Sequence, residues 1–254
     1  MSAASRLRCG GLVWAWTSAL VVAGCASTPA PAPKGVVPTA PSTTAELGQS
    51  DVNRMATLGM RANLDSLLSL ADKLYRRNPR EWRKGGAASR EEALERLRGA
   101  IEQRQPWPAL QGRRDIAALG LALSPEFAAD RVAAFIAATA DMVIVAHGGK
   151  TEFYLIDSLD AQSLYNAARN VEIAVWMLAQ RRDANGQPLL LADEIGTQAR
   201  NLSFEREFGK VVARLDLLAA VSAEKYRRAV VSYVQNLLGG TLLQFLPVRA
   251  VAAP

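Results

Sequence analysis

Cysteine and histidine are nearly absent from this chain of 254 residues. Both cysteines, Cys9 and Cys25, lie near the N-terminus, so the residues after Cys25 offer no disulfide, cysteine nucleophile or cysteine metal site. The one histidine, His147, excludes sites that need two, such as the helical zinc-protease motif and di-iron helix bundles. We therefore expect neither a metal ion nor a cofactor.

Motifs for nucleophilic catalysis and nucleotide binding are also missing. The chain has no Gly-x-Ser-x-Gly, which removes the esterase interpretation of His147-Gly148-Gly149. The run Gly148 to Thr151 ends like a P-loop, but Ile144 stands where that motif requires its first glycine. No catalytic motif therefore favours an enzyme.

The N-terminus has the layout of a secretory signal peptide, with arginines ahead of a short apolar run and small residues before Cys25. The sequence Val22-Ala23-Gly24-Cys25 resembles the lipobox of bacterial lipoproteins at all four positions. The resemblance implies that residues 1–24 are removed and that Cys25 carries lipid on its thiol and its amine. A lipid bilayer would then hold the rest of the chain.

The residue after Cys25 is Ala26 rather than aspartate, which in this family implies the outer membrane, with the domain facing the periplasm. An uncleaved membrane helix and a plain secreted protein are the alternatives. The apolar run from Gly10 to Gly24 is shorter than the roughly 20 residues that span a bilayer, which favours cleavage.

The positive charge of the chain is mild. Without Arg6 and Arg8 of the leader, 28 basic residues face 24 acidic ones. This excess permits attraction to anionic lipid headgroups or wall polymers, but it is not typical of a protein that binds nucleic acid.

Residues 25–47 are predicted to form a linker, and residues 48–254 a folded domain. Prolines among alanine, serine and threonine leave the linker little apolar surface to bury. An extended linker of this length reaches up to roughly 60 Å from the bilayer, and a flexible coil about 25 Å.

Hydrophobic residues recur at helical spacing through most of the domain, and only residues 152–157 favour a strand. We predict an all-α multi-helix bundle of about seven helices. Its centre should be Val132–Ala146, which is apolar on every side except at Thr139 and Asp141, because a helix that is hydrophobic all round is buried.

Caps and prolines give the expected helix bounds. The helices should run from Asp51 to Asn78, Ser89 to Pro106, Arg113 to Leu123, Ser124 to Ala146, onward from Asp160, Phe204 to Leu218, and Ser222 to just before Gly239. In the last helix Tyr226, Val230, Tyr233 and Leu237 are expected to point inward, and Leu242–Leu246 to pack back on the core.

The connection between residues 147 and 160 is one candidate site, because polar groups on a loop held between core helices often carry function. Its candidate residues are His147, Lys150, Glu152, Tyr154 and Asp157. The alternative is structural: His147 complements a helix C-terminus and Asp160 caps the next helix.

A basic cluster near Tyr75 and Trp82 is the second candidate. It consists of Lys73, Arg76, Arg77, Arg80, Arg83 and Lys84. Arginine suits phosphate and carboxylate groups, so the cluster predicts contact with lipid phosphates, acidic wall polymer or an acidic protein. The alternative is a solvated helix end whose cations complement the helix dipole.

Our leading hypothesis is a membrane-anchored envelope lipoprotein that acts as a non-catalytic interaction or assembly module, with an envelope protein or the cell wall as partner. The alternative is a periplasmic domain that binds a small molecule or glycan through residues 147–160. Hydrolysis of a glycan would use paired carboxylates such as Asp193 with Glu194 or Glu205 with Glu207.

Overall fold

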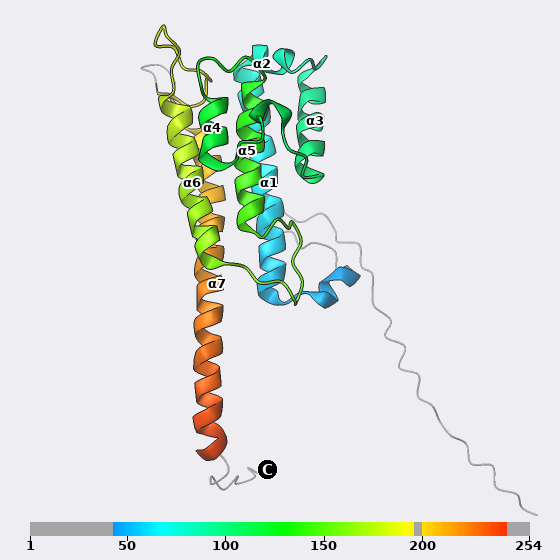
Figure 1. The fold of residues 1–254 in the computed structure, drawn as a ribbon, viewed down its shortest axis with the longest axis vertical. Coiled ribbons are helices and arrows are strands. Elements are labelled where there is room, and N and C mark those ends of the chain that lie inside the picture. The colour runs from blue at the N-terminus through cyan, green and yellow to red at the C-terminus, as the bar shows by residue number, and fades with distance from the viewer. Residues whose placement is uncertain (1–42, 196–199, 243–254) are drawn as a thin grey trace, which may run out of the picture. The chain divides into compact units, whose positions relative to one another are not determined.

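Helices make up almost all of the regular structure in the computed structural model, which describes residues 43–195 and 200–242 (Figure 1). The elements are η1 (Thr44–Gly48), α1 (Asp51–Arg77), α2 (Pro79–Lys84), α3 (Arg90–Glu102), η2 (Pro108–Leu110), α4 (Asp115–Ala122), α5 (Arg131–Ala146), α6 (Ala161–Gln180), β1 (Glu194–Ile195), β2 (Arg200–Asn201) and α7 (Ser203–Leu242). The predicted all-α bundle is confirmed. The predictions for residues 1–42, which include the leader and the lipobox, lie outside the described residues, and residues 44–47 of the expected linker belong to η1.

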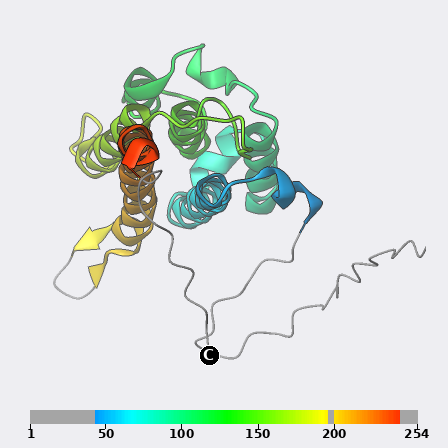
Figure 2. The same cartoon turned by 90° about the horizontal axis from the view of Figure 1, so that it is seen from below.

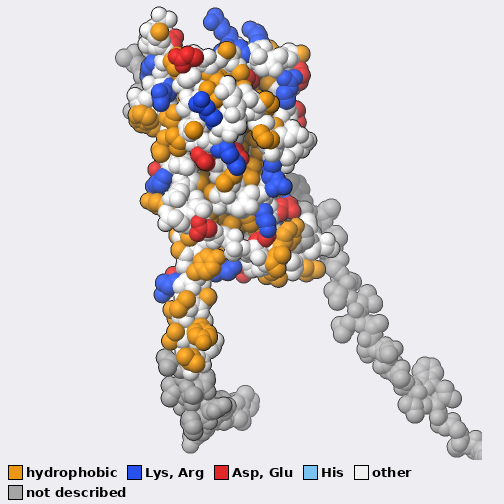
Figure 3. All heavy atoms as spheres, in the orientation of Figure 1, with side chains coloured by type: hydrophobic (Ala, Val, Ile, Leu, Met, Phe, Trp, Pro, Cys, Tyr) orange, Lys and Arg blue, Asp and Glu red, His pale blue; other side chains and the backbone are white. Residues whose placement is uncertain are grey.

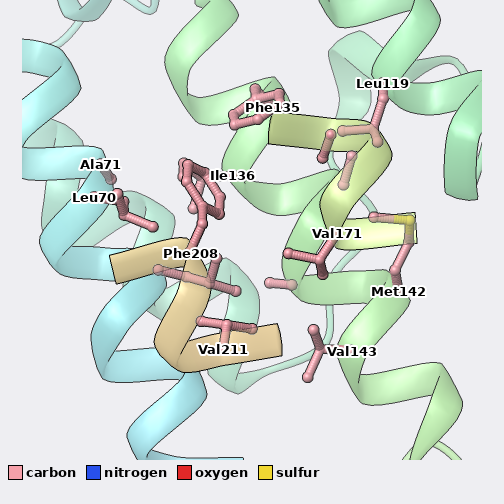
Figure 4. Packing of buried hydrophobic residues seen from close by; sticks show 14 of the residues in the cluster. Leu70, Ala71, Leu119, Phe135, Ile136, Met142, Val143, Val171, Phe208 and Val211 are labelled. Carbon is pink, nitrogen blue, oxygen red and sulfur yellow. The ribbon is translucent and has the colours of Figure 1, made fainter. Parts of the chain in front are cut away.

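The central helix is α5, as predicted. Thirteen of its sixteen residues are buried, and it packs against α1, α3, α4 and α6. Figure 4 shows its side chains meeting those of α1, α4, α6 and α7, and the rings of Phe135 and Phe208 meet edge to face with centroids 6.2 Å apart. The apolar composition of α5 thus places it inside the bundle, and the amphipathic helices surround it.

The longest helix, α7, runs antiparallel to both α6 and α1 along one side of the bundle (Figure 1). Arg214 of α7 donates hydrogen bonds of 3.2 Å to the carbonyl of Ala62, to Asn63 Oδ1 and to Ser66 Oγ on α1. Nearer the start of α7, Lys73 of α1 lies 3.9 Å from Glu207. These contacts fix the register between the two helices.

The start of α5 differs from the prediction. Ser124, Pro125 and Glu126 precede the helix rather than opening it, and Asp130 is the N-cap, accepting a hydrogen bond of 3.0 Å from the amide of Ala133. The guanidinium of Arg131 binds the carbonyls of Ser124 and Phe127, so the backbone before the cap is satisfied without helical bonds.

The predicted break at Ser222 is wrong, because α7 continues through Ser222 and Gly239 to Leu242. The run Ala219-Ala220-Val221-Ser222-Ala223 contains no glycine or proline that would end a helix, and a serine inside such a run is tolerated. The predicted inward position of four side chains is also wrong: Tyr226 is 51% exposed, Val230 64%, Tyr233 70% and Leu237 64%. Of the expected C-terminal apolar tail, residues 243–246 lie outside the described part of the chain.

Two short segments also differ from expectation. Residues 152–157 form a turn closed by a hydrogen bond of 2.8 Å from the amide of Asp157 to the carbonyl of Tyr154, not a strand. The only strands in the described residues are β1 and β2, which pair antiparallel between α6 and α7 with Glu194 opposite Asn201. The described α-helices do number seven, but α2 was not expected and α7 replaces two predicted helices.

Candidate functional site

The loop from residue 147 to 160 is closed by contacts among its own residues and α1. His147 is buried, its Nδ1 lies 2.7 Å from the carbonyl of Val143, and its ring lies against Phe153. Lys150 pairs with Asp157. Glu152 binds Arg61 of α1 at 2.8 Å and accepts a hydrogen bond from the hydroxyl of Tyr154 at 3.1 Å.

The electrostatics of this loop favour structural roles for its charged groups. The hydrogen bond from Arg61 lowers the pKa of Glu152, and that from Lys150 lowers the pKa of Asp157. Burial lowers the pKa of His147, which therefore stays neutral at pH 7. A general acid needs a carboxyl group with a raised pKa, and neither of these two carboxyl groups has one.

The basic cluster spreads over the end of α1 and the whole of α2, and its members differ in exposure. Lys73 and Arg77 are half-buried. Four cations are exposed, and we call them the basic surface: Arg76, Arg80, Arg83 and Lys84. Figure 3 shows Lys and Arg side chains projecting from this end of the bundle, away from the C-terminal end of α7.

Local partners leave part of the basic surface uncompensated. Arg76 pairs with Asp72 at 2.7 Å, and Lys84 pairs with Glu81 at 2.6 Å. The guanidinium of Arg83 stacks on the ring of Trp82, 4.8 Å from its centroid. Within the described residues, neither Arg80 nor Arg83 forms an ion pair. These two guanidiniums are therefore available to an anionic partner.

A buried polar network holds α2 against the start of α5. Glu81 accepts a hydrogen bond of 2.9 Å from the amide of Arg131, whose guanidinium lies 3.8 Å from the same carboxylate. That guanidinium also donates to the carbonyls of Ala122, Ser124 and Phe127. A helix of six residues is not stable alone in water, so this network is what positions the basic surface.

Asp130 and Tyr75 complete the network. The hydroxyl of Tyr75 donates a hydrogen bond of 2.7 Å to Asp130 Oδ2. Burial raises the pKa of Asp130, although the hydrogen bonds from Ala133 and Tyr75 oppose it, and burial also raises the pKa of Tyr75. Sequence reasoning missed Glu81, Asp130 and Arg131. The sequence does contain one indication of this network: Asp130 and Arg131 stand at the start of the most apolar helix, where a buried charge requires a partner.

A cleft with a volume of about 580 Å³ lies between α3, η2, α4 and α5. Apolar side chains such as Ile101, Trp107 and Ile144 line its walls. Arg104, Arg113 and the pair of Arg114 with Asp141 stand at the same cleft. No pattern in the sequence predicted this cleft, which touches the 147–160 loop only at Gly149.

Backbone strain is concentrated around this cleft. Among the described residues, only three other than glycine have a positive φ: Arg104 at 53°, Gln111 at 54° and Asp115 at 51°. Arg104 lines the cleft, and the other two are each adjacent to a residue that does. Strained backbone often accompanies functional sites, so the cleft is a second place where a ligand could bind.

No group of three or more histidine, cysteine, aspartate or glutamate side chains in the described part of the chain could hold a metal ion. Comparisons with protein families, curated proteins and solved structures find no match for this chain. The features that point to a function are therefore the basic surface, the cleft and the sequence of the N-terminus.

Proposed function

We propose that this protein is an envelope lipoprotein, held by lipid on Cys25, which acts as a non-catalytic interaction module for an acidic partner protein. The localisation proposed is the outer membrane, with the domain in the periplasm. The observation that carries the interaction is the basic surface, because Arg80 and Arg83 stand exposed on a helix that a buried ion-pair network fixes. The linker between Cys25 and the domain would let the domain extend from the bilayer toward such a partner.

Crosslinking in intact cells tests the interaction. A photoreactive residue at position 80 is expected to give one defined adduct, and the same residue at position 98 on α3 none. Arg98 is a matched control because it is also an exposed arginine, with a neighbouring acid, Glu95, at 3.6 Å. A second substitution, Arg83→Glu, should abolish the adduct at position 80. An adduct that survives Arg83→Glu and high salt would contradict a charge-based interface.

Lipidation is tested separately by the mass of the N-terminal peptide. The peptide should begin at Cys25 and carry lipid on the sulfur and on the amine. A mature protein that retains residues before Cys25, or a Cys25 with a free thiol, would refute the membrane anchor whatever happens at position 80.

The cleft supports a second candidate function, the binding of an apolar molecule with an anionic group. Its apolar walls suit a hydrocarbon chain, and Arg113 has no ion pair within the described residues. Dodecyl phosphate is a suitable probe. Calorimetry should show binding to the wild-type protein and loss of binding in Ala137→Phe, which fills the cleft. No measurable binding at millimolar probe would exclude this candidate.

A further inference from the structure

The C-terminal half of α7 extends beyond the bundle. Ser222 is the last buried residue of the helix, and every described side chain from 223 to 237 is exposed. Figure 1 shows this part of α7 continuing past the ends of its neighbours, and in Figure 2, seen from below, its end (red) lies in front of the other helices. At 1.5 Å per residue, residues 223–242 project by about 30 Å. We call residues 223–242 the α7 extension.

One face of the α7 extension is apolar. Tyr226, Val230, Tyr233 and Val234 follow one another at helical spacing, i, i+4, i+7 and i+8, and their exposed fractions are 51%, 64%, 70% and 45%. Figure 3 shows hydrophobic side chains along the projecting helix. An isolated helix of this length is marginal in water, and a contiguous apolar face of this kind marks an interaction site.

The charges along the α7 extension indicate lipid rather than another protein helix. Lys225, Arg227 and Arg228 stand at its start, with Glu224 as the one acid. After Arg228 the sequence carries no charged residue until Arg249. Helices that pair in water flank their apolar seam with charges, which residues 229–242 lack. Cations followed by an uncharged apolar segment are instead typical of a contact with anionic phospholipid.

The two tyrosines on the apolar face agree with this interpretation. Tyr226 and Tyr233 have apolar rings with a polar hydroxyl, and such side chains favour the boundary between headgroups and hydrocarbon. Beyond Arg228 the rest of the helix surface carries uncharged polar groups, Ser232, Gln235 and Asn236, together with Val231. The extension is therefore amphipathic in the manner of a helix that lies in a membrane interface.

Other apolar side chains are exposed at the same end of the bundle. Leu155 is 64% exposed and Ile156 94%, in the loop before α6, and Leu47 of η1 is 87% exposed. The amide of Leu155 donates a hydrogen bond of 2.8 Å to the carbonyl of Gly48, which joins the loop to η1. The described part of the chain also begins at this end of the bundle, with η1 and the start of α1 (Figure 1).

We propose that the α7 extension docks into a bilayer that contains anionic phospholipid, as a second membrane contact besides Cys25. No helix in the described residues is both long and apolar enough to cross a membrane, so the contact is with the interface. In this orientation the basic surface, at the other end of the bundle, faces away from the lipid. This inference rests on the proposed function, because the lipid on Cys25 is what would hold the domain near a bilayer. The two proposals are tested by different measurements.

The test uses two variants of the full-length mature protein, each with one introduced cysteine as its only free thiol: Tyr233→Cys on the apolar face and Ser232→Cys on the polar face. Each is labelled with an environment-sensitive fluorophore and reconstituted in vesicles of phosphatidylcholine with phosphatidylglycerol. Spin-labelled acyl chains should quench the label at position 233 several-fold more strongly than at position 232. Quenching at both positions also shows contact with lipid.

Two outcomes overturn the inference. No quenching at either position leaves the extension in water. A shifted emission at position 233 without quenching, together with a disulfide between two chains in the unlabelled Tyr233→Cys variant, identifies a second copy of the protein as the partner. Replacement of Lys225 and Arg228 by glutamate should lower the quenching at position 233 several-fold in vesicles that contain phosphatidylglycerol and leave it unchanged in vesicles of phosphatidylcholine alone.

The parent protein separates this inference from the proposed function. With lipid on Cys25 and the leader removed, it has no free thiol to label. Labelling of the parent at Cys25 refutes the lipid anchor, while peptide mapping still allows the label at position 233 to report on α7.

Discussion

Replacing Arg131 with methionine should destabilise the protein substantially. The arginine is 5% exposed, its guanidinium binds three backbone carbonyls, and it lies 3.8 Å from Glu81. Methionine occupies a similar volume, so the loss arises from the polar contacts rather than from a cavity. Removing one partner of a buried ion pair costs about 3–5 kcal/mol.

The lower part of that range is expected, about 3 kcal/mol, because Lys84 and the amide of Arg131 still face Glu81. In a domain of this size each kcal/mol lowers Tm by about 2–4 °C, so Tm should fall by roughly 6–12 °C. Urea unfolding followed by circular dichroism measures the free energy, and an unchanged m-value shows that the native fold is kept.

Arg114→Met is the matched control. Arg114 also binds a carboxylate, Asp141, with contacts of 2.9 and 2.7 Å, but its side chain is 58% exposed. An exposed pair contributes less than about 1 kcal/mol. If Arg131→Met costs no more than this control, the network does not hold α2 in place. The double variant Arg131→Met with Glu81→Leu should recover part of the loss, because no buried charge remains.

Three further predictions concern buried groups. His147→Phe should flatten the pH dependence of stability between about pH 5 and 7. Burial lowers the pKa of His147 in the folded protein, so the wild type loses stability as pH falls below about 6.5. The chain has no other histidine that could cause such a loss. Asp130→Asn should also remove a pH dependence of stability, one of the opposite sign and at more acid pH. Burial raises the pKa of Asp130 in the folded protein, so its contribution to the free energy of unfolding is fully present below about pH 3.9 and is lost as pH rises through the folded pKa. Urea unfolding at a series of pH values measures this, and a variant whose stability depends on pH as the wild type's does would contradict it. Phe208→Ala should cost about 3–5 kcal/mol in urea unfolding, since Phe208 is 1% exposed and packs on Phe135; a loss under 1 kcal/mol would show that the core refills the space.

Local patterns predicted most of the fold correctly. Ser89 and Asp160 cap α3 and α6 as expected, with hydrogen bonds of 3.1 and 2.8 Å to the amides of Glu92 and Ser163. The uniform apolarity of α5 predicted its central position. These signals are readable because a cap and a buried helix each depend on residues that are close in the chain.

The candidate site was only partly predictable. The cationic residues of α2 are visible in the sequence, but their exposure depends on Glu81, which lies 50 residues from Arg131 in the chain and meets it only in the folded bundle. The cleft was not predictable either, because its walls come from four separate elements that meet only in the folded bundle. The 147–160 loop shows the converse: its polar residues looked available, and the fold pairs them with one another and with Arg61.

The sequence by itself determined that this protein is helical, where most of its helices lie, and that thiol chemistry is excluded after Cys25. Tertiary structure alone decided which apolar faces are covered. The stripe on α7 continues unbroken past Ser222, but α6 begins only at Ala161 and α1 at Asp51, so no neighbouring helix is left to bury Tyr226 or Tyr233. Periodicity reveals an apolar face, whereas its burial depends on the lengths and register of other helices, which no local pattern encodes.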